Sequence, residues 1–193
     1  MAGQRIGSGC RAGIDAHQSP AFRGSEMAMR LLQLFTSWAL IMVVNGTLVA
    51  SATTLNAKPV PEMLFERLDG SSLALSALQG TVLLINFWGT WCAPCLKEIP
   101  ELVHLSRQYK TRGFEVVGIA VNSGPPEDIR AFMRDHQMDY RVLIGEMSPI
   151  KRHFRVVGFP TSFLVDRHGI IRHCYFGPQT EERLKNDVES LLE

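Results

Sequence analysis

The chain has 193 residues and a mass of 21.6 kDa, the size of one ordinary globular domain with a short appendage. Apolar residues make up 46% and charged residues 20%, a balance that excludes an intrinsically disordered protein. Twenty basic against 19 acidic residues leave a formal charge of +1, so no polycationic surface is available to bind nucleic acid. Four cysteines are too few for a fold built on disulfides, which leaves a soluble enzyme or a binding domain.

An apolar segment near the N-terminus has the pattern of a secretory signal peptide. Arg30 supplies the positive charge, residues 31–44 form the apolar stretch, and Ala50-Ser51-Ala52 is an A-x-A cleavage site. A transmembrane helix needs about 20 unbroken apolar residues, and polar side chains interrupt this segment. We therefore expect residues 1–52 to be a leader that is cleaved, with an uncleaved membrane anchor as the alternative.

The compartment follows from this leader. Residues 1–26 lack apolar periodicity, and Met27 or Met29 would make a more usual start, so our hypothesis is that residues 1–26 lie outside the true start. An exported chain works where thiols tend to be oxidised. We expect a periplasmic or otherwise extracytoplasmic protein, soluble after cleavage, or one tethered to the inner membrane if the leader is kept.

The remaining chain reads as a linker and one domain. Residues 53–62 hold two prolines and are expected to be an extended linker before a single domain at 63–193. Residues 64–68 and 72–75 predict a short hairpin. The nearly continuous apolar run at 82–88 is typical of a central strand that is covered on both faces.

The next elements alternate between helix and strand. A helix is expected from near Cys92 to about Tyr109, and the apolar run 114–121 predicts a second buried strand. A helical stripe of core residues follows, formed by Ile129, Phe132, Met133 and His136. The last predicted elements are a strand at 140–144, a helix at 149–154, a hairpin of strands 161–165 and 170–176, and a helix capped by Thr180. This order predicts an α/β sandwich with a mixed sheet.

The chemistry is concentrated in Trp91-Cys92-Ala93-Pro94-Cys95, where the predicted central strand gives way to a helix. Two thiols three positions apart at a helix start can close into a disulfide ring. Cys92 lies at the first turn, where unpaired N–H groups and the helix dipole favour a thiolate. That thiolate can attack a partner's disulfide, and Cys95, one turn further on, then resolves the mixed disulfide. Pro94 fits the first turn because its missing N–H would be unpaired there.

Two longer runs of sequence carry a family resemblance. The run from Asn86 to Pro100, NFWGTWCAPCLKEIP, and the run from Gly158 to Asp166, GFPTSFLVD, resemble two signatures of the thioredoxin superfamily. Within it, they are similar to the exported thiol–disulfide oxidoreductases of the ResA and TlpA type. The resemblance extends from about residue 60 to the C-terminus. It implies a thioredoxin fold with a mixed central sheet flanked by helices, and with an extra helix and strand at about 126–144.

The resemblance also implies the roles of individual residues. Cys92 is then the nucleophile, Cys95 the resolving thiol, and Pro160 the cis-proline that faces the redox-active Cys92–Cys95 disulfide. Backbone groups beside such a proline can hold a substrate strand. The residues expected to contact substrate are Trp91, Ala93, Pro94, Phe159 and Thr161.

The sequence departs from cytoplasmic thioredoxins at a residue that transfers protons to and from the active-site thiol. Cytoplasmic thioredoxins carry a buried Asp on the strand before the motif, and here that position is Asn86. Glu98, one turn after Cys95, matches a carboxylate of the ResA-like branch and could serve as the proton relay instead. A carboxylate in apolar surroundings tends to hold its proton, the state that this task requires. The alternative is that Glu98 is only a first-turn acid favourable to the helix dipole, and that Asn86 is structural.

Other uses of a C-x-x-C pair fit the sequence less well. A structural zinc needs four ligands, and the further candidates, His168, His173 and Cys174, lie far away with no second C-x-x-C. A purely structural disulfide is disfavoured because so small a loop contributes little stability. Cys174 is expected to be a buried apolar residue on a strand. We therefore expect no metal and no cofactor beyond the disulfide.

Two functions on related folds remain as alternatives. A thiol peroxidase needs Pro and Thr ahead of its nucleophilic cysteine, and the corresponding residues here are Ile85 and Gly89. A copper carrier could use the thiolates as soft ligands for Cu(I), but its family pattern spaces the cysteines differently and adds a histidine. A peroxide-consumption assay and the metal content after purification distinguish these alternatives from thiol–disulfide exchange.

The sequence therefore favours an exported thiol–disulfide oxidoreductase. Ala93-Pro94 between the thiols resembles the reducing members of the superfamily more than the strong oxidants. The expected partners are exported client proteins that carry disulfides, such as those of cytochrome c maturation or copper delivery, and a membrane thiol electron donor. We expect a monomer with no nucleic-acid partner.

Overall fold

The computed structural model describes residues 58–193, and the predicted leader at 1–52 lies outside them. The strands are β1 (Lys58–Pro59), β2 (Leu64–Arg67), β3 (Ser72–Ala74), β4 (Val82–Trp88), β5 (Phe114–Val121), β6 (Arg141–Gly145), β7 (Thr161–Val165) and β8 (Ile170–Phe176). The helices are α1 (Ala93–Tyr109), α2 (Pro126–Asp135), α3 (Met147–Phe154) and α4 (Glu181–Leu192), with 3-10 turns η1 (Leu75–Leu78) and η2 (Lys110–Arg112). None of the helices in this part of the chain is both long and apolar enough to cross a membrane.

The eight strands form one mixed sheet in the order β1-β8-β7-β4-β5-β6-β2-β3. β4 lies inside it, parallel to β5 and antiparallel to β7. All seven residues of β4 are buried, as expected of an apolar strand covered on both faces. The chain leaves the sheet after Trp88 and begins α1 at Ala93, so the short connection between them carries the C-x-x-C segment.

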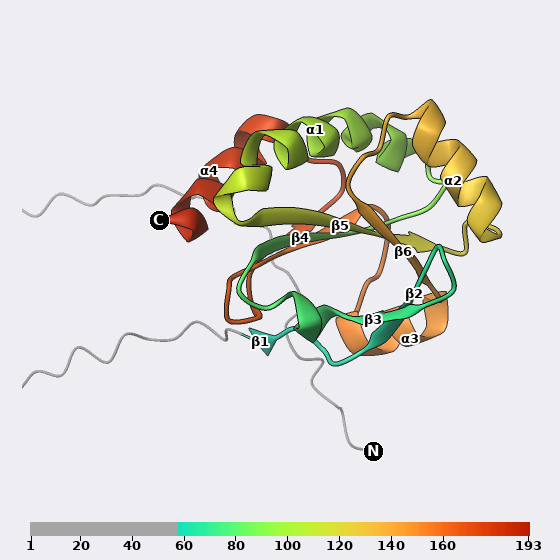
Figure 1. The fold of residues 1–193 in the computed structure, drawn as a ribbon, viewed down its shortest axis with the longest axis horizontal. Coiled ribbons are helices and arrows are strands. Elements are labelled where there is room, and N and C mark those ends of the chain that lie inside the picture. Colours follow the sequence, from blue (N-terminus) through green and yellow to red (C-terminus); the bar gives the residue numbers. More distant parts are fainter. Residues whose placement is uncertain (1–57) are drawn as a thin grey trace, which may run out of the picture. The chain divides into compact units, whose positions relative to one another are not determined.

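Helices cover both faces of the sheet, with α1, α2 and α4 on one face and α3 on the other (Figure 1). Successive side chains of β4 point to opposite faces. Leu84 and Trp88 therefore pack in a core with residues of α1 and α4, whereas Ile85 and Phe87 pack in a second core with residues of α3. Asn86 lies on the same face as Leu84 and Trp88, so it is a polar residue between two apolar residues of the α1-side core.

The predicted α/β architecture is confirmed, including the N-terminal hairpin (β2–β3) and the extra helix and strand (α2–β6). Some details differ from the prediction. Residues 53–62, expected to be a linker, contain β1, which pairs with β8 through Lys58 and Ile171. His136 was expected to pack in the core, but it follows the last residue of α2 and is exposed, with its ring 4.2 Å from that of Phe132. Of the predicted stripe, only Ile129 is fully buried.

Candidate active site

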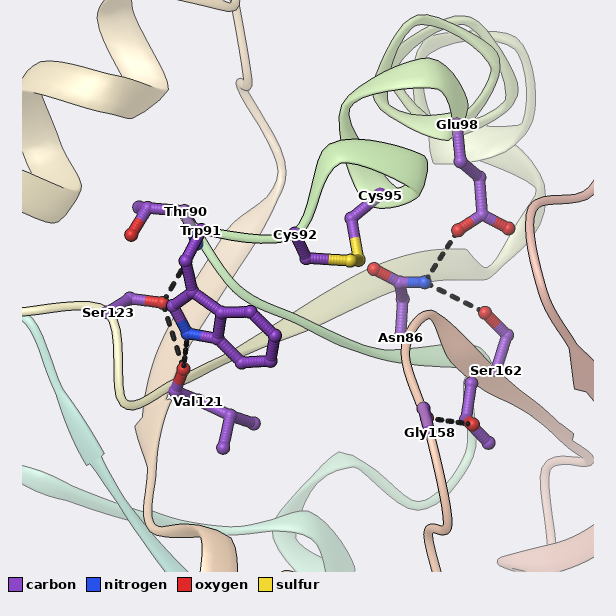
Figure 2. Close-up of a disulfide and its surroundings, with 11 residues drawn as sticks. Asn86, Thr90, Trp91, Cys92, Cys95, Glu98, Val121, Ser123, Gly158 and Ser162 are labelled. Atoms are coloured by element: carbon purple, nitrogen blue, oxygen red, sulfur yellow. Dashed lines mark hydrogen bonds between the residues drawn. A yellow bond between two sulfur atoms is a disulfide. The ribbon is translucent and has the colours of Figure 1, made fainter.

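The two cysteines of the motif form a disulfide at the start of α1, with their sulfur atoms 2.08 Å apart (Figure 2). Cys92 is the N-cap residue of α1, and Pro94 lies in the first turn as predicted. The backbone carbonyl of Cys92 accepts a hydrogen bond from the N–H of Cys95, at 3.0 Å. The first turn contains no acidic residue, so the positive end of the helix dipole acts on Cys92 without an opposing charge.

The two cysteines are buried, whereas the residues beside them are accessible. Cys92 is 3% exposed and Cys95 1% exposed. Trp91 is 54% exposed, and Ala93 and Pro94 are exposed as well. A partner that reaches the disulfide therefore meets these three side chains first.

Trp91 is held in a fixed position despite its exposure. Its indole Nε1 donates to the carbonyl of Val121 at 3.1 Å, and its ring meets that of Phe159 edge to face at 5.4 Å. Gly89 is required for this arrangement, because a Cβ atom there would lie 2.6 Å from the indole. The hydroxyl of Ser123 donates to the same Val121 carbonyl (Figure 2). The contact with Phe159 joins the C-x-x-C segment to the loop before β7.

That loop contains the predicted cis-proline. The Phe159–Pro160 peptide bond is cis, in agreement with the sequence prediction. The Thr161 hydroxyl donates to the Gly158 carbonyl at 2.7 Å, and Thr161 is buried, so its side chain holds the loop and does not present itself to a partner. The carbonyl of Pro160 accepts from the N–H of Gly177 at 3.0 Å, which ties the loop to the end of β8.

Glu98 lies in a buried hydrogen-bond network behind the disulfide. It is 1% exposed and lies beyond the first turn of α1, so it is not a first-turn acid. One carboxylate oxygen accepts from Asn86 Nδ2 at 3.0 Å, and the other accepts from the backbone N–H of Gln179 at 3.1 Å. Asn86 Nδ2 also donates to Ser162 Oγ on β7 at 2.9 Å. In Figure 2 the Asn86 carboxamide and the Trp91 indole are drawn on opposite sides of the disulfide.

Burial raises the pKa of Glu98 from 4.5 to about 7, against the opposing effect of the hydrogen bonds from Gln179 and Asn86. Loss of hydration disfavours the carboxylate, while each donated hydrogen bond favours it. Glu98 can therefore exchange a proton near neutral pH. A side chain with this property, three residues after a cysteine on the same helix, can act as an acid or a base towards that cysteine.

The structure brings the predicted site residues together and adds others. The C-x-x-C segment meets the cis-proline loop through Trp91 and Phe159, and Glu98 lies on the same side of the sheet as Asn86. Sequence reasoning missed Ser162 and the backbone of Gln179, which complete the network around Glu98. It also missed two exposed apolar side chains near the cis-proline loop, Val157 (83% exposed) and Phe176 (60% exposed).

The residues considered for a metal do not converge. Among residues 58–193, no three His, Cys, Asp or Glu side chains gather in a way that could hold a metal ion. Cys174 was expected to be buried, but it is half-buried on β8, at the margin of the core that includes Phe163.

Known proteins resemble this chain over most of its length. The model of the Redoxin family matches residues 55–192. The thiol–disulfide oxidoreductase ResA of Bacillus cereus is 33% identical over 135 residues, which are 69% of this chain and 77% of that protein. ResA of Geobacillus kaustophilus is 31% identical over 68% of this chain and 75% of its own length. A thiol:disulfide interchange protein of the thioredoxin family from Chlorobium tepidum superposes with a TM-score of 0.63 and 29% identity, covering 71% of this chain and 97% of that one.

The fold and the disulfide at the start of α1 define a thiol–disulfide oxidoreductase of the thioredoxin superfamily. The mixed sheet has the thioredoxin fold, as the resemblance implied. Because the family model covers well over half of its residues, the chain belongs to the Redoxin family, where its relatives are of the ResA type.

Proposed function

We propose that this chain is an exported reductant of disulfides in selected client proteins. The observation that carries the proposal is the placement of the pair, with Cys92 at the N-cap of α1 and Cys95 one turn behind it. The helix dipole lowers the pKa of a cysteine at that position and increases its thiolate fraction. The names of the ResA relatives describe thiol–disulfide exchange, which requires a protein or thiol partner that carries a disulfide.

The exchange follows from these roles. The thiolate of Cys92 attacks one sulfur of the client disulfide, forming a Cys92–client bond and releasing the other client sulfur as a thiolate. Cys95 loses its proton and attacks the sulfur of Cys92, which closes the Cys92–Cys95 disulfide and releases the second client sulfur. The client gains two electrons from the chain. Because Cys92 enters as a thiolate, Cys95 supplies one proton and the second comes from solvent. A membrane thiol donor then reduces the chain again.

Glu98 is proposed to take the proton of Cys95 in the second step. Its pKa of about 7 means that near neutral pH it is present in both protonation states. The carboxylate already accepts from Asn86 and from Gln179, so its orientation is set before the reaction. Asn86 and Ser162 act as positioning residues, because Asn86 donates to the carboxylate and Ser162 accepts a hydrogen bond from the same Asn86 amide.

The client is proposed to bind across Trp91 and the cis-proline loop. Trp91, Ala93 and Pro94 are accessible beside the buried Cys92, and Phe159 contacts Trp91. Pro160 marks the loop whose backbone would align an extended client segment. Clients with apolar residues beside the reactive cysteine fit this surface, and apo-forms of c-type cytochromes or copper-delivery proteins are the proposed classes.

The direction of transfer can be tested with the full chain. We expect an equilibrium potential nearer to about −270 mV, typical of reducing thioredoxins, than to about −120 mV, typical of strong oxidants. The reduced chain should reduce a disulfide within a C-x-x-C-H peptide, and the Cys92→Ser variant should not. A potential near the oxidising value would refute the assignment as a reductant, and peroxide consumption at a comparable rate would favour a peroxidase.

Export is proposed from the leader at 1–52 and has its own test. Cells that produce the full chain should hold it outside the cytoplasm, as a protein that begins at residue 53. A membrane-bound protein that keeps residues 27–52 would indicate the tethered form. Recovery in the cytoplasm with the leader intact would contradict export in either form.

A further inference from the structure

Two polar groups under α1 are buried without a hydrogen-bond partner in the described part of the chain. They are Trp88 Nε1, at the end of β4, and the hydroxyl of Tyr140, just before β6. Both residues belong to the core beneath α1. A buried donor that lacks a partner costs about 1–3 kcal/mol, and most such groups in native proteins are satisfied. Two of them in one core call for a common explanation.

The rings that carry these two groups pack over the same residue of the sheet. A Cβ atom at Gly118 of β5 would lie 2.9 Å from Trp88 Nε1 and 3.1 Å from Tyr140 Cε2. The glycine therefore lets both rings approach the sheet from the α1 side. Gly118 is also the β5 partner of Asn86 in the register of the sheet, and Asn86 is in turn the β4 partner of Ser162. The unpartnered groups thus adjoin the network that holds Glu98.

In the orientation that the structure shows, neither hydrogen-bond partner of the Glu98 carboxyl presents an acceptor to it. Both of its recorded partners, Asn86 Nδ2 and the Gln179 N–H, donate hydrogen bonds and satisfy the carboxylate. The protonated form has an O–H group that requires an acceptor, and an amide N–H cannot be one. Tyr140 is close enough to be affected by this charge: burial first, and the charge of Glu98 second, raise the pKa of its hydroxyl.

We propose that Trp88 Nε1 and the Tyr140 hydroxyl bind one internal water molecule beside the Asn86–Glu98 pair, and that this water hydrogen-bonds to Glu98. Buried waters typically make about three hydrogen bonds to polar groups that would otherwise be unsatisfied. This water accepts a hydrogen bond from Trp88 Nε1 and forms a second one with the Tyr140 hydroxyl. It accepts a third from Glu98 when the carboxyl group is protonated, and donates to Glu98 when the carboxyl group is ionised. The water site rests on the structure alone, whereas its part in proton transfer rests on the proposed function of Glu98.

The surroundings of Glu98 define what else can affect its titration. The groups recorded around it are Asn86 from β4, the backbone of Gln179 before α4, and Tyr140 before β6, with Cys95 on its own helix. Asn86 is neutral at every pH of interest, and the charge of Asp139 raises the pKa of the Tyr140 hydroxyl. Removing the Tyr140 hydroxyl is thus the most direct test of whether a water links it to Glu98.

The first experiment is a high-resolution crystal structure of the oxidised full chain and of its Tyr140→Phe variant. The variant keeps the ring and loses only the hydroxyl, so the core stays filled. We expect one ordered water within about 3.2 Å of both Trp88 Nε1 and the Tyr140 hydroxyl in the wild type, and its loss or displacement in the variant. A direct Trp88–Tyr140 hydrogen bond, or a site without a water, overturns the proposal.

The second experiment follows the Glu98 carboxyl by carbon-13 NMR as the pH is varied, with Glu98→Gln to assign the signal. Losing a hydrating partner disfavours the carboxylate, so Tyr140→Phe should raise the midpoint by about one pH unit. Tyr109→Phe, a matched control whose buried ring lies at the far end of α1 with its hydroxyl on Glu189, should leave it unchanged. An unchanged midpoint in Tyr140→Phe overturns the link between the water and Glu98.

The two readouts separate this inference from the proposed function. Suppose that the midpoint moves as expected, but the Glu98→Gln variant exchanges disulfides as fast as the wild type. The water site then stands, and the proton role of Glu98 fails. If Glu98→Gln impairs exchange but no water is found, the role of Glu98 stands and the water site fails.

Discussion

The two faces of the central sheet bury different kinds of side chain. On the α3 face, Phe87 packs against the rings of Phe154 and Phe163, with centroid distances of 4.9 and 5.9 Å. On the α1 face, the neighbouring residue Asn86 joins Glu98 in a hydrogen-bonded polar network. Burying apolar area favours folding, whereas burying polar groups costs free energy even when they are paired. One strand thus supports stability on one side and chemistry on the other.

The largest expected effect lies at the disulfide. Cys92→Ser should abolish thiol–disulfide exchange while the fold is kept, because closing so short a loop adds little stability. Reduction of a test disulfide measures the activity, and urea unfolding compared with the reduced wild type measures the stability. Exchange at the wild-type rate, or a variant that does not fold, would contradict the claim that the α1 face supports chemistry and the α3 face supports stability.

The next largest effect is on the apolar face. Phe87 is fully buried, so Phe87→Ala should lower the free energy of unfolding by about 3–5 kcal/mol. The variant that remains folded should still form the Cys92–Cys95 disulfide and exchange it. Urea denaturation and the exchange assay provide the two measurements, and a loss of less than about 1 kcal/mol would show that this face contributes less than proposed.

Glu98 gives a pH-dependent test of the polar face. Because its pKa in the folded chain is raised from 4.5 to about 7, the folded state binds the proton more tightly than the unfolded state does. That contribution to stability is complete below about pH 4.5 and is lost as the pH rises to about 7, a loss of about 3 kcal/mol. Glu98→Gln cannot ionise and should escape this loss.

The variant should therefore gain stability relative to the wild type across that pH range, and not below it. Urea unfolding of both oxidised proteins from pH 4 to pH 8 measures the difference. A difference that is flat with pH would mean that Glu98 titrates at its ordinary pKa and that burial does not set its protonation state.

The smallest effect is expected at the hydrogen bond from Asn86. Asn86→Ala removes a donor from the carboxylate, so the pKa of Glu98 should rise further, by about one unit. Ser162→Ala is the matched control, because Ser162 contacts Asn86 but donates nothing to Glu98. NMR titration of the Glu98 carboxyl compares them, and equal shifts in the two variants would contradict a direct role for the Asn86 amide.

Most of the fold was accessible from local sequence patterns. The apolar run of β4 and the helix start at the C-x-x-C segment depend on neighbouring residues, and both predictions are confirmed. His136 was misplaced because periodicity does not show where a helix ends, and the residue lies just past α2. β1 was missed because two residues carry too little pattern to indicate a strand.

The polar network could be predicted only in part. Glu98 and Asn86 were singled out by the family resemblance, but Ser162 reaches Asn86 through the pairing of β4 with β7, and register between distant strands is not written in either strand alone. Gln179 contributes a backbone N–H, which every residue except proline possesses, so its identity gives no signal. Tyr140 and Trp88 read as ordinary core aromatics in the sequence.

The most direct test asks whether the two sulfurs differ in reactivity as their positions on α1 imply. Reduced Cys95→Ala and reduced Cys92→Ser are mixed with the same excess of a peptide disulfide, and the covalent adducts are followed by intact mass. We predict rapid accumulation of a mixed disulfide on Cys92, the N-cap residue of α1, in the first variant and almost none on Cys95, which lies inside the helix, in the second. Equal rates, or faster reaction at Cys95, would contradict the assignment of Cys92 as the attacking thiol.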